Sequence, residues 1–185
     1  MRSTGLAAAL SAVLAGTALA DDVSDAIESG RKAYVDGELA KAKEALGLAS
    51  QLIGQKHAEA YAKMLPAPLA GWKADEVEIT AGGASYGASS ALRRYENRGV
   101  QIEVQISSDQ ALIAQFAATM AAREVAGAMG RIVTIGTTRA LQAADGDLYV
   151  AVGSQFIISV QGRNASADDK LAYARAIDLA ALSKL

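Results

Sequence analysis

One short segment constrains the fold of this chain more than any other, because it contains both of the prolines and the only tryptophan. The segment is Leu65–Trp72, with prolines at positions 66 and 68. Proline lacks the amide hydrogen that a helix interior uses, and it moves the preceding residue out of the helical conformation. The residues before this segment have a helical pattern, and those after it are mainly patterned as strands and turns. We therefore expect residues 65–72 to be a hinge between two kinds of structure.

Length and charge limit the class of protein. The 185 residues allow one medium-sized domain, or one domain with a small appendage. The net charge is −2 and no long run of either sign occurs, so the chain lacks the basic surface of a nucleic-acid binder. It contains no cysteine, which excludes disulfides, thiolate catalysis and haem attached through cysteine.

Residues 1–20 have the pattern of a secretory signal. Arg2 is followed by an uncharged, mainly apolar run over residues 6–19, and Ala18-Leu19-Ala20 matches the small-x-small cleavage site. The run is shorter than the roughly 20 apolar residues of a membrane-spanning helix. We therefore expect cleavage before Asp21, a mature chain that does not span a membrane, and a location in the periplasm of a Gram-negative bacterium.

Residues 21–64 are expected to form a helical hairpin. Ser24 is a candidate cap for the first helix, and Asp36-Gly37 is a turn signal before a second helix that begins near Glu38. Gly54 is expected to end or bend that second helix, which can then continue to Met64.

Small and apolar positions in this hairpin resemble one tetratricopeptide repeat, in which they let two antiparallel helices approach closely. These positions are Gly30, Gly37, Ala42, Leu46 and Ala49. A single repeat cannot bury its own apolar face. The resemblance therefore implies a hairpin that docks on the rest of the chain or on a partner, and not a peptide-binding array.

The pattern after the hinge is that of short strands joined by tight turns. A first strand is expected at residues 75–80, followed by a small-residue stretch, Gly82–Ser90, that suits a mobile loop or a wide bend. Residues 91–96 and 100–106 form the clearest hairpin, with Asn97-Arg98-Gly99 as its turn. The second strand alternates apolar and polar residues, which is typical of an antiparallel sheet with one buried face.

Two helices and four more strands complete the expected order. Ser107-Ser108-Asp109 is a cap for a helix that ends near residues 127–130, and Ser166 with Asp169 is a capping box for the last helix. The remaining strands are expected at residues 132–135, 139–143, 148–152 and 156–160.

This order predicts an α+β protein. We expect an N-terminal helical hairpin and then, over residues 73–185, an antiparallel sheet of about five to seven strands covered by two helices. From the Gly-Trp pair at residues 71–72 to Ile177-Asp178-Leu179 in the terminal helix, the layout resembles small exported proteins of unassigned role and the photosystem-oxygen-evolving-subunit-like proteins. The resemblance implies a curved antiparallel sheet covered by helices. It implies no function.

Our first functional hypothesis is a non-enzymatic periplasmic protein that binds another envelope protein or a peptide. The candidate anchors are Tyr34, Tyr61 and Trp72, because aromatic residues dominate interface hot spots. Trp72 has two alternative positions. It packs between the hairpin and the sheet, or it is exposed beside Tyr61 and marks a docking site.

The second hypothesis is a carrier of a small apolar ligand or lipid, held between the sheet and the helix that contains Phe116 and Met120. It requires an apolar cavity of at least ~300 Å³. Arg93, Arg94 and Arg98 are expected near one hairpin end, where they would bind an anionic headgroup or a carboxylate, or would simply be solvated.

An enzyme is the least favoured class. His57 is the only histidine, it has no partner at a metal-ligand spacing, and no G-x-S-x-G motif is present. Asp145-Gly146-Asp147 and the pair Asp168-Asp169 suit a hairpin turn and a helix N-terminus. We therefore expect no catalytic residues, no metal and no cofactor.

Overall fold

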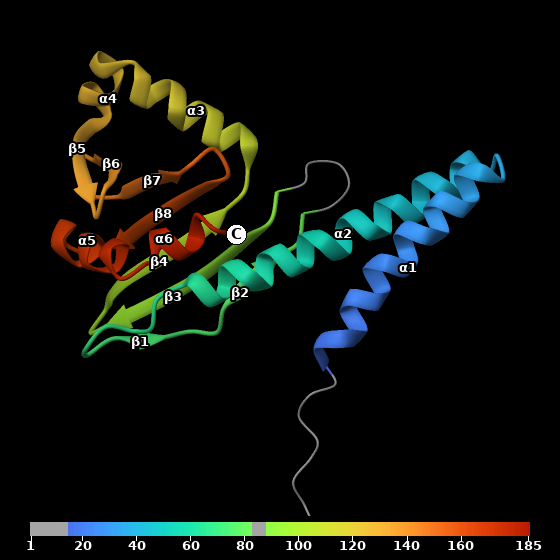
Figure 1. The fold of residues 1–185 in the computed structure, drawn as a ribbon. Helices are drawn as coiled ribbons and strands as arrows, with labels where there is room; N and C mark the ends of the chain where they lie inside the picture. The colour runs from blue at the N-terminus through green and yellow to red at the C-terminus, as the bar shows by residue number, and fades with distance from the viewer. Residues whose placement is uncertain (1–14, 83–87) are drawn as a thin grey trace, which may run out of the picture. The chain divides into compact units, whose positions relative to one another are not determined.

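The computed structural model describes residues 15–82 and 88–185 (Figure 1). The chain divides into two compact units, Met1–Leu52 and Ile53–Leu185. Most of the expected signal, residues 1–14, lies outside the described residues, and residues 15–20 belong to the first helix. Residues 83–87 of the small-residue stretch also lie outside the described part.

The first unit contains helix α1 (Ala15–Val35) and the first half of helix α2 (Leu39–Met64). The turn between them includes Gly37, whose φ of +78° suits a residue without a side chain. Ser24 lies inside α1 and does not begin it, so the expected cap is wrong.

The two helices of this hairpin approach closely through small residues, as expected. A Cβ atom added to Gly30 would lie 2.8 Å from Cγ of Leu46, which is shorter than a normal contact. Within the described part of the first unit, four alanines are buried: Ala26, Ala33, Ala42 and Ala49.

The second unit is built on one antiparallel sheet of eight strands (Figure 1). Their order is β1-β3-β4-β8-β7-β6-β5, and β2 pairs with β3. The strands are β1 (Lys73–Ala74), β2 (Glu78–Thr80), β3 (Ser90–Asn97), β4 (Val100–Ser107), β5 (Gly130–Ile135), β6 (Thr138–Ala143), β7 (Leu148–Val152) and β8 (Phe156–Arg163). The α+β class is confirmed. The sheet has one strand more than the expected maximum because β1 and β2 replace the single strand expected at residues 75–80.

The hairpin between β3 and β4 is confirmed, but its turn is shorter than expected. Asn97 pairs with Val100 inside the ladder. Arg98 and Gly99 alone form the turn, with φ values of +49° and +84°. Positive φ at both central residues is typical of the tight turns that match the twist of a hairpin.

Each of the two helices expected after the hinge consists of two helices in the structure. The first is α3 (Gln110–Ala121) followed by α4 (Arg123–Met129), and the second is α5 (Ala167–Arg175) followed by α6 (Leu179–Leu182). The Asp109 cap and the Ser166–Asp169 capping box are both present. Asp178 caps α6 by accepting a hydrogen bond from the Ala181 amide, which explains the second break.

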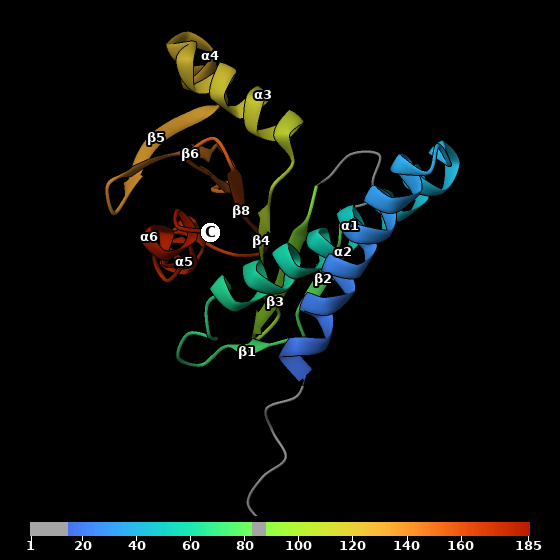
Figure 2. The ribbon, with the colours of Figure 1, turned by 45° about the vertical axis from the view of Figure 1, so that its right-hand side comes forward.

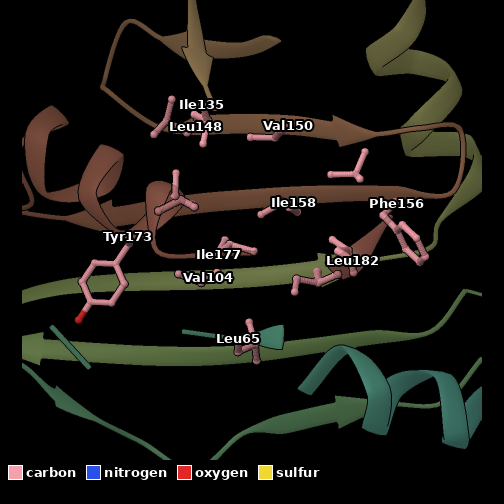
Figure 3. Close-up of a cluster of buried hydrophobic side chains, with 14 of the residues drawn as sticks. Leu65, Val104, Ile135, Leu148, Val150, Phe156, Ile158, Tyr173, Ile177 and Leu182 are labelled. Carbon is pink, nitrogen blue, oxygen red and sulfur yellow. The ribbon is translucent and has the colours of Figure 1, made fainter. Parts of the chain in front are cut away.

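The two faces of the sheet are covered by different helices (Figure 2). Helices α5 and α6 and the last turns of α2 pack on one face, which we call the inner face, where they form the main core (Figure 3). Helix α3 packs on β7 and β8 from the opposite, outer face. Alternation along the strands separates the two faces: Ile102, Val104 and Ile106 of β4 belong to the main core.

Hydrogen bonds attach the proline segment to this core. The Tyr95 hydroxyl donates to the Pro66 carbonyl at 2.7 Å, and the Leu69 amide donates to the Tyr173 hydroxyl at 3.3 Å. The Trp72 ring meets Tyr173 edge-on, with 5.2 Å between ring centroids. The segment is therefore held in place by buried side chains of β3 and α5.

Helix α2 continues through Gly54 without the expected end. The Gly54 carbonyl accepts a hydrogen bond of 2.8 Å from the Ser89 hydroxyl, which in turn accepts one from the Gly82 amide at 3.2 Å. A side chain at position 54 would lie 2.6 Å from the Gly82 carbonyl oxygen. Glycine is present here because the backbone of another segment packs directly on the helix.

Candidate functional site

A cavity of about 340 Å³ lies between helices α3 and α4 and the outer face of the sheet. Its floor is formed by β4, β6, β7 and β8, and its roof by the two helices. The lining residues are Gln105, Ser107, Leu112, Gln115, Phe116, Thr119, Met129, Leu141, Tyr149, Ile157, Ser159 and Gln161. The volume lies within the range of small-molecule sites and above the minimum that the carrier hypothesis requires.

The floor follows directly from strand alternation. In the ladder register, Gln105 of β4 lies opposite Ser159 of β8, and Ser159 lies opposite Tyr149 of β7. Tyr149 in turn lies opposite Leu141 of β6. Because the neighbours of these residues along each strand point into the main core, this row of four points to the outer face.

The roof is positioned by a small apolar cluster at one end of the cavity. Ile113 and Phe116 of α3 are buried against Leu141 and Ile157 of the sheet. The Asp109 side chain accepts hydrogen bonds from two amides in the first turn of α3, at 2.9 and 3.2 Å, and so holds the start of the helix.

The polar side chains of the floor keep hydrogen-bonding capacity. The Gln161 amide nitrogen donates to the Tyr149 hydroxyl at 3.0 Å, which leaves the Tyr149 hydrogen and the Gln161 carbonyl oxygen able to bond a ligand. The half-buried side chains of Gln105 and Ser159 bond no other residue within the described part of the chain.

No charged side chain occurs among the described residues that line this cavity. Glu103 lies two residues from Gln105 on β4 and opposite Gln161 in the next row. Its carboxylate accepts a hydrogen bond of 3.0 Å from Arg94, so this charge already has a partner. The cavity therefore offers neutral hydrogen-bonding groups and apolar walls.

The structure places one of the two predicted apolar ligand residues in the cavity wall. Phe116 lines the cavity. Met120 packs against the apolar cluster but does not line the cavity. The methionine in the cavity wall is Met129 of α4. Sequence reasoning missed Met129 because it treated α3 and α4 as one helix, and the break between them reorients the second part.

The three predicted arginines do not converge. Arg93 donates to the Asp75 carbonyl and lies 5.8 Å from the centroid of the Tyr95 ring. Arg94 points to the other face of β3, where it pairs with Glu78 and Glu103. Arg98 is exposed in the turn. Successive residues of a strand point to opposite faces, so neighbouring arginines on β3 cannot form one anion site.

The three predicted aromatic anchors are in three different environments. Tyr34 is 68% exposed in the first unit. Tyr61 is buried and meets Phe156 edge-on at 5.4 Å between ring centroids. Trp72 is half-buried against Tyr173 and not beside Tyr61. Trp72 is therefore packed and not exposed beside Tyr61, but its partner is Tyr173 of α5 and not the helical hairpin.

A buried ion pair was not anticipated. The Lys170 side chain is 2% exposed, and its ammonium group donates to the Asp147 carboxylate at 2.6 Å and to the Asp145 carbonyl at 2.9 Å. Asp147 also accepts from the Gly162 amide at 3.2 Å. The turn at residues 145–147 is thus tied to α5, which gives these aspartates a structural role.

A larger hollow of about 550 Å³ lies beside the turns that follow β5 and β7. Its lining includes the charged residues Arg175 and Asp178 and the short helix α6. The cavity under α3 has a helix as its roof and a sheet as its floor, and no charged side chain of the described residues lines it. It therefore has the features of a ligand pocket more clearly than the larger hollow.

His57 is exposed on α2, with its ring 6.1 Å from that of Tyr61. Within the described ranges, no group of three or more histidine and carboxylate side chains lies close enough together to hold a metal ion.

No protein-family model, curated protein or solved structure matches this chain. The resemblance in layout to small exported proteins thus rests on the order of the elements alone. In residues 15–82 and 88–185, no helix is long and apolar enough to cross a bilayer.

Proposed function

We propose that this protein is an exported, non-enzymatic carrier of a small apolar ligand, which it binds in the cavity between α3 and the sheet. The observation that carries the proposal is the cavity of about 340 Å³ walled by Phe116, Leu141 and Ile157. An apolar helix face packed on a sheet normally fills this space with side chains. Here the apolar cluster fills only one end of the interface between α3 and the sheet, and the cavity occupies the rest.

Exposed apolar side chains at the mouth of the cavity support the same proposal. Leu112 and Met129 both line the cavity and are each about half exposed, at 47% and 51%. A bound apolar molecule would cover part of both side chains, and each buried methylene would contribute about 0.8 kcal/mol. Methionine adapts its shape readily, which suits a residue at the entrance of a ligand site.

Among the residues that the structure describes, the lining has no carboxylate, imidazole or amine group that could act as an acid or a base beside its hydroxyls, which supports a carrier over an enzyme. Catalysis of acyl, phosphoryl or glycosyl transfer needs a nucleophile, an acid or a base at the reacting atom. Among the lining residues the titratable group is the Tyr149 phenol, which accepts a hydrogen bond from Gln161. The export pattern of residues 1–20 supports a periplasmic location.

The proposal is tested with the neutral fluorophore N-phenyl-1-naphthylamine, titrated into the purified mature protein. We expect saturable fluorescence enhancement with one site per chain. The variant Ser159→Phe fills the centre of the floor, and we expect it to lose binding. Ser154→Phe introduces the same side chain in the exposed turn between β7 and β8 and should bind as the wild type does.

A second readout uses the natural source. Native mass spectrometry of the mature protein from its own periplasm should detect a bound small molecule that is released on denaturation. The carrier proposal fails if no molecule is released and if the fluorophore either does not bind or binds the Ser159→Phe variant equally well.

A second candidate function is binding of an envelope protein through the tip of the helical hairpin. Tyr34, Val35 and Leu39 surround the turn between α1 and α2 and are 65–70% exposed. Three large apolar side chains grouped at one exposed turn are unusual for a surface without a partner. The double variant Tyr34→Ser/Leu39→Ser should abolish capture of a periplasmic partner without changing fluorophore binding.

A further inference from the structure

We infer that the ligand is an uncharged amphiphile, with a neutral hydrogen-bonding head on the polar floor and an apolar body against α3. This inference rests on the proposed carrier function and specifies the chemistry of its ligand. It has three requirements. The cavity must disfavour a charged head group, and it must offer hydrogen bonds to a neutral one. The polar and the apolar side chains of its lining must also lie mainly in different places.

The cavity cannot neutralise a charged head. Its lining contains neither an acidic nor a basic side chain, as described above. A buried charge without a partner is strongly unfavourable, because the low dielectric interior replaces its water shell. Glu103 in the next row does not help, because it is already paired with Arg94. A fatty-acid carboxylate or an alkyl ammonium group would therefore be selected against.

The floor offers hydrogen bonds to a neutral head at one place. Gln105 and Ser159 lie directly opposite each other across β4 and β8, and Tyr149 lies opposite Ser159 on the other side. Amide and hydroxyl groups together can both donate and accept. A hydroxyl, amide or carbonyl on the ligand thus finds partners in this row.

Most of the apolar lining lies beside this row, and Leu141 of β6 continues the row beyond Tyr149. Phe116 and Leu112 belong to the roof, and Ile157 lies at the α3 end of the floor, next to the buried Ile113. An apolar body placed there lies beside the polar row and not on it. The ligand that satisfies both surfaces has one polar end and one apolar end.

The test compares three twelve-carbon molecules that differ only in the head group. Dodecanol, dodecanoate and dodecylamine compete with N-phenyl-1-naphthylamine for the wild-type protein at about pH 8, where the acid and the amine are ionised. We expect dodecanol to displace the fluorophore at a concentration at least ~10-fold lower than either charged molecule, corresponding to a tenfold difference in dissociation constant.

A charge placed on the floor should reverse this order. In Gln105→Lys, dodecanoate should become the best competitor, because its carboxylate gains a partner at the position of the head. Gln101→Lys makes the same charge change on β4 outside the cavity, and it should keep the wild-type order. If Gln105→Lys does not fold, Gln115→Lys at the exposed rim provides the same test with a smaller expected gain.

The outcomes separate this inference from the carrier proposal. Fluorophore binding with equal or better displacement by a charged competitor overturns the inference and leaves the carrier proposal intact. The same conclusion follows if none of the three displaces the fluorophore, or if folded lysine variants keep the wild-type order. If the fluorophore does not bind the wild type and no small molecule is released on denaturation, the carrier proposal itself is contradicted.

Discussion

At the scale of single residues, the proline segment owes its position to two buried tyrosines. Tyr95 and Tyr173 are almost inaccessible to water, and their rings lie 4.3 Å apart between centroids. Each hydroxyl takes part in a hydrogen bond to the backbone of the proline segment, at Pro66 and at Leu69. The segment thus has a defined place in the core although its own residues cannot form a helix.

Removing one of these hydroxyls should lower the stability of the folded protein. In Tyr95→Phe, the Pro66 carbonyl loses its donor while it remains buried. We expect a loss of about 1–3 kcal/mol in the free energy of unfolding, the usual cost of an unsatisfied buried polar group. Urea denaturation measures it. Tyr34→Phe removes an exposed hydroxyl and serves as the control, with a change near zero.

The same tyrosine predicts a response to alkaline pH. Burial raises the pKa of the Tyr95 phenol, and burial also raises the pKa of Tyr173. The neutral phenols are therefore favoured in the folded state, and their contribution is complete below pH ~10, the pKa of an unfolded tyrosine. Stability should fall as the pH rises above that value. Tyr95→Phe should show a shallower fall, and an identical pH profile would contradict this assignment.

The buried ion pair between Lys170 and Asp147 should also matter for stability. Lys170→Met removes the charge that compensates a carboxylate of which 16% is exposed. We expect a loss of about 3 kcal/mol in the free energy of unfolding, which is at the lower end of the range for breaking a buried ion pair. The loss is limited because Asp147 keeps its hydrogen bond from the Gly162 amide. Lys41→Met breaks the exposed pair with Glu38 and should cost less than about 1 kcal/mol. Equal effects of the two substitutions would refute a structural role for the buried pair.

At the scale of secondary-structure elements, the sequence pattern predicted the strands well and the breaks in the helices poorly. Strand β4 and strands β5 to β8 were recognisable because alternation and turn residues are local signals. Neither interruption contains glycine or proline: nothing local marks the one at Ala122, and the second is marked only by the capping side chain of Asp178. They depend on how each short helix meets the sheet.

Gly54 gives a direct test of packing between elements. Alanine favours a helix over glycine by about 1 kcal/mol, so Gly127→Ala in α4, with open space around it, should stabilise the protein by up to that amount. Gly54→Ala has the same local gain, but its methyl group would collide with the Gly82 backbone. We expect a net loss of about 1–3 kcal/mol in the free energy of unfolding, which thermal or urea denaturation measures. A stabilising Gly54→Ala would show that the contact is not tight.

At the scale of the whole molecule, the division into two units falls inside α2, between Leu52 and Ile53. The residues of α2 after this point belong to the sheet domain, because Tyr61 is buried in the main core next to Leu65. We therefore expect the fragment 53–185 to fold cooperatively and to keep the fluorophore site. Fragment 65–185 lacks Tyr61 and should be less stable by several kcal/mol. Circular dichroism during thermal unfolding of both fragments tests this boundary.

The sequence by itself determined the class of fold, the order of the elements and most strand bounds, because periodicity, caps and turn residues act over a few positions. It also placed the ligand hypothesis at the helix with Phe116, since one apolar stripe on α3 must meet one face of the sheet. It did not reveal the row formed by Gln105, Ser159 and Tyr149, which comes from three strands. Their meeting depends on the ladder register. Only the tertiary structure decided that register, along with the cavity under α3 and the burial of Lys170, because each requires segments far apart in the chain to pack together.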